Sequence, residues 1–261
     1  MSDSRILNLE AINNFRDYGG YAGADGAKVR LGDLWRSGHH GAATPADLAA
    51  VHQLGIATVI DLRGDSERAA NPCLRHPEFS GTVVYAPGET AGLKAAAAHE
   101  ESAGEVRSFT DAQGVMVRLY EGMAWRSVLV ETLKLYFAAL AASNQPTLLH
   151  CFAGKDRTGL AADLLHHVLG VHPDDAMADY LLTNRAANIE RRIATGVHAV
   201  KGMGEQMSDD ALRALLSVRP EYLETARTAI AVRHGSVDAY LAQVLAVDPA
   251  MVTAIRANHL V

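Results

Sequence analysis

The feature that most constrains the fold of this chain is residues 150–159, His-Cys-Phe-Ala-Gly-Lys-Asp-Arg-Thr-Gly. The segment follows a short apolar run at 146–149, which predicts a buried strand, and precedes residues 160–169, whose apolar positions have helical spacing. The chain must therefore pass from a strand through a tight loop into a helix. Such a loop directs several backbone N–H groups and the positive end of the helix dipole toward one point.

This loop predicts an anion site beside a reactive sulfur. The field that attracts a phosphate also favours the thiolate form of Cys151, which makes this residue a candidate nucleophile. Arg157 could hold two phosphoryl oxygens through its planar guanidinium, and the hydroxyl of Thr158 could steady the sulfur as a leaving group. His150 is expected to hydrogen-bond the loop and tune Cys151 rather than to act as a base.

The segment resembles the Cys-x5-Arg signature of the protein tyrosine phosphatase superfamily. Its filling, Cys-x-Ala-Gly-Lys-Asp-Arg-Thr-Gly, is similar to that of a bacterial branch of atypical, broad-specificity phosphatases, which includes secreted mycobacterial and listerial enzymes acting on phosphotyrosine and phosphoinositides. Further segments resemble that branch in the same order, namely 14–20 (Asn-Phe-Arg-Asp-Tyr-Gly-Gly), 34–38 (Leu-Trp-Arg-Ser-Gly), 59–63 (Val-Ile-Asp-Leu-Arg), 219–223 (Arg-Pro-Glu-Tyr-Leu) and 234–237 (His-Gly-Ser-Val).

The resemblance implies a cysteine-dependent phosphomonoester hydrolase that works through a cysteinyl phosphate and needs neither a metal nor a cofactor. Its substrates would be phosphorylated proteins or peptides, with phosphoinositides as an alternative. The phosphate would be held by the loop residues Phe152, Ala153, Gly154, Lys155, Asp156, Arg157 and Thr158.

Two aspartates are candidates for the general acid that protonates the leaving group. Asp61 ends a predicted strand and matches the aspartate to which the family assigns this task, although it could instead be a structural partner of Arg63. Asp156, inside the loop, is the second candidate and could instead orient Arg157. Lys155 adds a cation of the kind found in phosphatases that accept inositol lipids, with a solvated loop lysine as the alternative.

The elements along the chain predict an α/β fold with a mostly parallel central sheet flanked by helices. The expected elements are short strands within 11–36, a helix over 44–54 that begins with Thr-Pro, strands at 56–62 and 82–86, a helical stretch over 116–142 broken near Gly122, and a helical part at 173–261. Ligands of such sheets bind at the carboxyl ends of the strands, where both Asp61 and Cys151 would lie.

Residues 88–114 fit neither a core helix nor a strand, and their length predicts a lid or insertion, with a solvated surface excursion as the alternative. In the amino-terminal motif, Arg16 and Asp17 are expected to pair, and Arg36 is expected to brace the sheet edge.

Composition bounds the remaining choices. A chain of 261 residues suits a single domain, taken here as 1–261, and a net charge of −6 argues against a general nucleic-acid binder. Two cysteines, Cys73 and Cys151, make no disulfide framework, although oxidation could join them. No apolar run predicts a transmembrane segment, and the first residues lack the pattern of a signal peptide, so we expect a cytoplasmic protein, with signal-independent secretion as the alternative.

Two other function classes compete with the phosphatase. A rhodanese-like sulfurtransferase also places a cysteine in a loop before a helix, but the residues 157–159 and the amino-terminal motifs count against it. A non-catalytic module would bind phosphate in the same loop without turnover.

Overall fold

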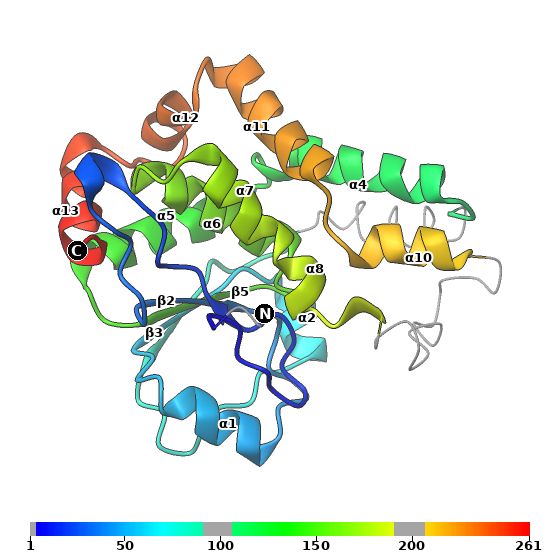
Figure 1. Ribbon diagram of the computed structural model, residues 1–261, viewed down its shortest axis with the longest axis horizontal. Coiled ribbons are helices and arrows are strands. Elements are labelled where there is room, and N and C mark those ends of the chain that lie inside the picture. Colours follow the sequence, from blue (N-terminus) through cyan, green and yellow to red (C-terminus); the bar gives the residue numbers. More distant parts are fainter. Residues whose placement is uncertain (1–3, 91–105, 191–206) are drawn as a thin grey trace.

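A single five-stranded sheet lies at the centre of the computed structural model, which describes residues 4–90, 106–190 and 207–261 (Figure 1). The strand order is β1-β2-β5-β3-β4, with only β1 antiparallel to its neighbour. The strands are β1 (Arg16–Asp17), β2 (Leu34–Ser37), β3 (Thr58–Asp61), β4 (Thr82–Val84) and β5 (Thr147–His150). The predicted α/β class with a mostly parallel sheet is confirmed.

Both faces of the sheet are apolar and both are covered. Successive strand residues point to opposite faces, so Leu148 of β5 packs into one hydrophobic cluster and Leu149 into another. The same alternation places Val59 and Ile60 of β3 in those two clusters. A strand that is apolar at successive positions must be buried on both sides, as the run at 146–149 predicted.

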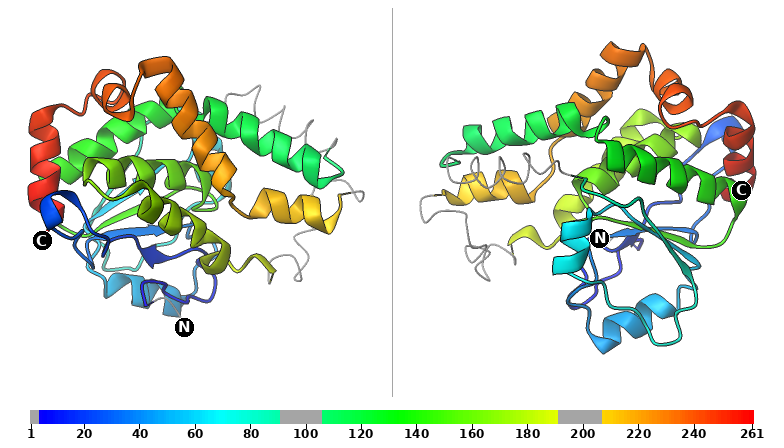
Figure 2. Two further views of the ribbon diagram at one scale, coloured as in Figure 1. Left: turned by 45° about the horizontal axis from the view of Figure 1, so that its top comes forward. Right: turned by 180° about the vertical axis from the view of Figure 1, so that it is seen from behind.

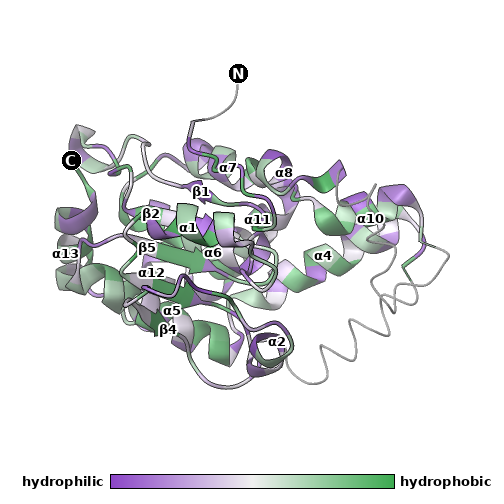
Figure 3. Ribbon diagram, turned by 90° about the horizontal axis from the view of Figure 1, so that it is seen from below, coloured by the Kyte–Doolittle hydropathy of each residue, from purple (hydrophilic) through white to green (hydrophobic). Residues whose placement is uncertain are grey.

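One face is covered by α1 (Pro45–His52). The side chain of Thr44 caps this helix by accepting a hydrogen bond from the backbone of Asp47, whose carboxylate accepts the backbone N–H of Thr44 in return. Seen from below, α1 lies in front of the strands, and β5 behind it is largely hydrophobic (Figure 3). The helix start predicted from Thr-Pro is therefore confirmed.

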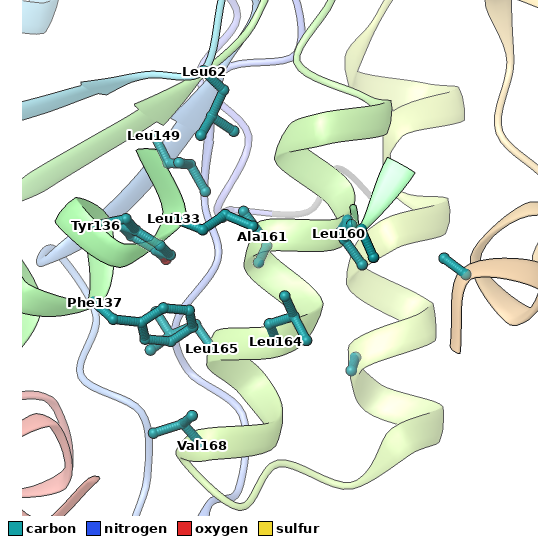
Figure 4. Packing of buried hydrophobic residues seen from close by; sticks show 14 of the residues in the cluster. Leu62, Leu133, Tyr136, Phe137, Leu149, Leu160, Ala161, Leu164, Leu165 and Val168 are labelled. Carbon is teal, nitrogen blue, oxygen red and sulfur yellow. The ribbon is translucent and has the colours of Figure 1, made fainter. Parts of the chain in front are cut away.

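The other face carries the larger core, built on α5 (Ser127–Ala142) and α6 (Asp156–Val168). Figure 4 shows Tyr136 and Phe137 of α5 packed beside Leu165 of α6, with Leu149 of β5 next to them. The remaining helices are α2 (Asp65–Ala70), α4 (Phe109–Met123), α7 (Pro173–Leu181), α8 (Thr183–Ala186), α10 (Asp209–Leu216), α11 (Pro220–His234), α12 (Val237–Gln243) and α13 (Pro249–His259).

The predicted helical stretch 116–142 is two helices, α4 and α5, and the break falls at residues 124–126, just after Gly122. The first helix starts earlier than expected, at Phe109, because Ser108 caps it by accepting the backbone N–H of Asp111. The last part of the predicted lid, 88–114, therefore belongs to a helix, and most of its length, 91–105, lies outside the described residues. The two views in Figure 2 show α4 beside α10, beyond the edge of the sheet.

The hydrophobic core between α5, α6 and the sheet leads to a prediction about stability. We expect Leu165→Ala to lower the free energy of unfolding by about 2–5 kcal/mol, because it leaves a cavity in the packed layer between α5 and α6. Leu135→Ala on α5 is the matched control, since its side chain is 42% exposed and its loss should cost far less. Urea unfolding of both variants measures the difference, and equal losses would contradict this packing.

Candidate active site

The cysteine loop connects β5 to α6 at the carboxyl edge of the sheet. Cys151 follows directly after β5, is buried, and lies next to the end of β3, where Asp61 is paired in register with His150. The helix begins at Asp156, so the predicted order of strand, loop and helix is confirmed. The peptide N–H groups of 152–157 donate to no residue in the described part of the chain, which leaves them available to an anion.

Gly154 shows how closely the loop approaches the neighbouring strand. Its φ is +69°, and a Cβ atom there would lie 2.3 Å from the carbonyl oxygen of Ser37, so no side chain fits. The carbonyl of Gly154 accepts hydrogen bonds from the side-chain amide of Asn14, at 2.6 Å, and from the guanidinium of Arg36, at 3.2 Å. Two segments far from the loop in sequence therefore fix its backbone.

A buried ion-pair network holds those two segments. Asp179, on α7, is paired with Arg36 at 2.6 Å and with Arg16 at 3.3 Å, and Arg16 also donates to the side chain of Asn14. Burial alone would raise the pKa of Asp179, but the two guanidinium groups outweigh burial and lower that pKa to about 2. The expected pairing of Arg16 with Asp17 is wrong, because Asp17 instead accepts the backbone N–H groups of Gly19 and Gly32.

Arg157 is held by a carboxylate that the sequence analysis did not single out. Its guanidinium donates to both oxygens of Glu67 on α2, at 2.5 and 2.7 Å, and to the hydroxyl of Thr90 at 2.8 Å. Burial disfavours the charge, yet Glu67 and the neighbouring Cys151 more than compensate and raise the pKa of Arg157 above its ordinary value. This bidentate contact fixes the plane of the guanidinium beside the loop.

Asp156 has a different environment from that of the other loop residues. Its Oδ1 atom accepts a hydrogen bond from the hydroxyl of Tyr120 at 2.8 Å, and that hydroxyl lies 2.7 Å from the hydroxyl of Tyr180. The carboxylate is 18% exposed, and its Oδ2 accepts no hydrogen bond from the described residues. Asp156 thus keeps one carboxylate oxygen without a hydrogen-bond partner among the described residues, in a side chain that is partly exposed.

Lys155 is turned inward and is 7% exposed. Its ammonium group donates to the carbonyl oxygens of Leu215 and Ser217, at 2.6 and 3.3 Å, and lies 3.3 Å from Asp156. These contacts tie the loop to the last turn of α10 and to the residue that follows it. Lys155 is therefore not a solvated loop lysine. Its ammonium group is also not free to bind a lipid headgroup, because it is buried and hydrogen-bonded.

Asp61 lies close to the loop but is fully engaged. Its two oxygens accept bonds from the guanidinium of Arg63 at 2.9 and 2.7 Å, and the backbone N–H of Arg63 donates at 3.1 Å. Burial raises the pKa of Asp61, but the bonds from Arg63 outweigh it and leave that pKa below its ordinary value. His150 is fully buried, and mainly this burial lowers its pKa to about 4, so it is neutral at pH 7.

Two further side chains complete the surroundings of the loop. The hydroxyl of Thr158 is buried and has no hydrogen-bond partner among the described residues. Arg126, at the start of α5, is near enough that the charges of Arg157 and Asp156 act on it, and burial is the main reason its pKa is lowered. Both cysteines are free thiols, and Cys73 accepts the backbone N–H of His40 at 3.2 Å.

Sequence reasoning found the loop but missed its supports: Asn14 as an anchor, Glu67, Thr90, Tyr120, Arg126, Asp179 and Tyr180. Asn14 was inside a recognised motif, so that motif was a usable signal. The others lie on separate helices or connections, and no local spacing marks them.

The family model of the tyrosine phosphatase family matches residues 7–261. The chain belongs to the tyrosine phosphatase family. This phosphatase is 36% identical to a tyrosine-protein phosphatase of Cupriavidus necator over 249 residues, which cover 94% of this chain and 85% of that protein. It is 32% identical to the triple specificity protein phosphatase PtpB of Mycobacterium tuberculosis over 267 residues, which cover 90% and 92%.

The similarity to a tyrosine-protein phosphatase of Nostoc commune is shorter, with 31% identity over 161 residues, 60% of this chain and 48% of that protein. The family resemblance and the assignment as a phosphatase of the tyrosine phosphatase type are therefore confirmed. No helix in the three described ranges of the phosphatase is long and apolar enough to cross a membrane.

The network around Asp179 generates a pH-dependent prediction. We expect Asp179→Asn to lower the stability of the phosphatase by about 3–5 kcal/mol at pH 7, because two buried guanidinium groups lose their counter-charge. Because the pKa of Asp179 is lower in the folded state, its carboxylate stabilises the fold when the pH is above the ordinary pKa of a carboxyl group. This stabilisation is lost as the pH falls toward 2. The difference in free energy of unfolding between wild type and variant should therefore become smaller below a pH of about 4.

Urea unfolding at several pH values measures that difference. Asp174→Asn is the control, because its carboxylate is 94% exposed and its loss should change little at any pH. A difference that stayed constant down to the lowest accessible pH would show that folding does not lower the pKa of Asp179.

Proposed function

We propose that this phosphatase hydrolyses phosphomonoesters in two steps through Cys151. The thiolate attacks phosphorus, the bond to the ester oxygen breaks, and a cysteinyl phosphate forms while the leaving oxygen takes a proton. Water then attacks phosphorus, the sulfur–phosphorus bond breaks, and inorganic phosphate leaves. The observation that carries this proposal is the loop that begins at Cys151: its N–H groups at 152–157 donate to none of the described residues, and Glu67 holds the guanidinium of Arg157.

The same loop supplies the groups that stabilise the transition state. The peptide N–H groups of 152–157 and the guanidinium of Arg157 would bind the equatorial oxygens, over which the negative charge is spread. Thr158, whose hydroxyl has no partner in the described parts of the chain, would donate it to the sulfur when the second step expels that sulfur. Arg126 adds a second positive charge near the entering dianion.

We infer that Asp156, rather than Asp61, is the general acid. Asp61 is ionised by its contacts with Arg63, and its oxygens are occupied. Asp156 keeps a free oxygen in the cysteine loop, and Tyr120 holds the carboxylate through its other oxygen. A proton donor needs both a reachable oxygen and a fixed orientation, and only Asp156 of the two has them.

For the substrate we propose phosphotyrosine in proteins or peptides. The ring of Phe152 is 40% exposed beside the nucleophile and stacks on His39 with 4.6 Å between ring centres, which provides a flat apolar surface for an aryl group. The name of the mycobacterial relative supports extending the proposal beyond a single phosphoamino acid. Phosphoinositides as substrates and a cytoplasmic location stay predictions of the sequence.

The nucleophile is tested with an aryl phosphate. We expect Cys151→Ser to lower turnover to the level of the buffer while phosphate or vanadate still binds, because the loop N–H groups and Arg157 are retained. Cys73→Ser is the control for loss of a thiol and should keep its turnover. Unchanged turnover in the Cys151 variant would refute sulfur attack, and thiosulfate turnover by a wild type inactive on aryl phosphate would instead indicate a sulfurtransferase.

The general acid is tested by pH–rate profiles of Asp156→Asn and Asp61→Asn. Loss of the true acid should lower kcat by about 10²–10⁴ for a poor leaving group and remove the basic limb of the profile. We expect that result for Asp156, whereas Asp61→Asn should mainly lower the melting temperature because it frees the buried guanidinium of Arg63. The reverse pattern would reassign the acid to Asp61.

A further inference from the structure

A cavity lies on the α1 face of the sheet. This cavity of about 320 Å³ is bounded by the end of α1, the amino ends of β3 and β4, and the connection that leads into β4. Its lining combines apolar residues such as Leu48, Val51 and Leu148 with three metal-ligating side chains, those of His52, His76 and Glu78. None of these three groups has a place in the reaction described above.

We propose that His52, His76 and Glu78 bind a zinc ion at this cavity. Each offers one ligand atom, and the three atoms all lie within 4.8 Å of one another. One oxygen of Glu78 is 3.5 Å from Nε2 of His52 and 4.0 Å from Nδ1 of His76. These separations are too long for good hydrogen bonds, and they leave room for an ion between the groups.

The donor set has the chemistry that zinc prefers. Two imidazole nitrogens and one carboxylate oxygen form a frequent set of three protein ligands, with metal–ligand distances of about 2.0–2.2 Å. Nδ1 of His76 accepts the backbone N–H of Glu78 at 3.3 Å, so its lone pair must give up this long hydrogen bond when it binds the ion. The two rings are stacked with 4.1 Å between their centres and 15° between their planes, so their in-plane lone pairs are nearly parallel, and at least one ring must turn for both to bind one ion.

The burial of the three residues fits an ion bound at the edge of the cavity. The side chains of His52 and His76 are 32% and 26% exposed, which restricts their orientations, whereas that of Glu78 is 78% exposed and free to turn toward the ion. Three protein ligands leave a fourth tetrahedral position, which water in the cavity can occupy.

The ion would act on the structure and not on the reaction. His52 ends α1, and His76 and Glu78 belong to the connection between α2 and β4, so zinc would join two elements that no strand pairing connects. Cys151 lies at the opposite, carboxyl edge of the sheet. We therefore expect zinc to raise the melting temperature by binding only the folded chain.

The experiment measures zinc binding to the full chain with a competing chromophoric chelator. Both cysteines are first replaced, by Cys151→Ser and Cys73→Ser, so that thiolates contribute no binding. We expect one zinc per chain, a zinc-dependent rise in melting temperature, and at least about a tenfold loss of affinity in His52→Ala, His76→Ala and Glu78→Gln. His172→Ala is the matched control, because this exposed histidine also lies near a carboxylate, 3.6 Å from Asp174, but is outside the cluster. The His172→Ala protein should bind zinc with unchanged affinity.

Absence of zinc binding, or binding that survives all three substitutions, would overturn the site. Cobalt gives a second readout, since an ion held by nitrogen and oxygen in four-coordinate geometry absorbs visible light strongly, and this absorption should vanish in the same variants. The result is independent of the catalytic proposal. A chain with intact Cys151 that carries His52→Ala should still turn over aryl phosphate.

Discussion

The buried carboxylate of Asp179 is the interaction on which the rest of the site depends. It neutralises Arg16 and Arg36, which belong to separate sequence motifs and would otherwise repel each other in a region closed to water. Arg36 and the Arg16-bound Asn14 both donate to the carbonyl of Gly154. The shape of the cysteine loop is thus set by charges on α7, β1 and β2, and not by the loop alone.

The three carboxylates near the loop differ in their hydrogen-bond partners. Both oxygens of Asp61 accept hydrogen bonds from Arg63, and Glu67 holds the guanidinium of Arg157 beside the loop. Asp156 has one oxygen bound by Tyr120 and the other without a partner among the described residues. All three are acidic side chains within one small region, yet each has a different partner. Tyr120, paired with Tyr180, holds the carboxylate of Asp156 without adding charge, which fits the role of proton donor that we propose for it.

The cysteine loop and the cavity lie at opposite ends of the strands. The carboxyl ends of β3 and β5 carry the loop and its partners, as expected for ligand sites in parallel sheets. The amino ends of β3 and β4 border the cavity beside α1, with the histidine and glutamate cluster at its edge. Figure 1 shows α1 on the opposite face of the sheet from α5 and α6. Because the cavity is lined by α1, a ligand there would stabilise α1 without touching the α5–α6 layer.

By itself the sequence determined the local order of strand, loop and helix, the apolar faces of the strands, and the cap at Thr44, because these depend on residues close together in the chain. It also identified Cys151 and Arg157, whose spacing is part of a single loop. Only the tertiary structure decided which side chains meet across the site: Asp179 with two arginines, Glu67 with Arg157, Tyr120 with Asp156. Asp61 had matched the family motif with Arg63 as its alternative structural partner, and only the fold decided between the two, because burial and the occupation of both oxygens are properties of the folded chain.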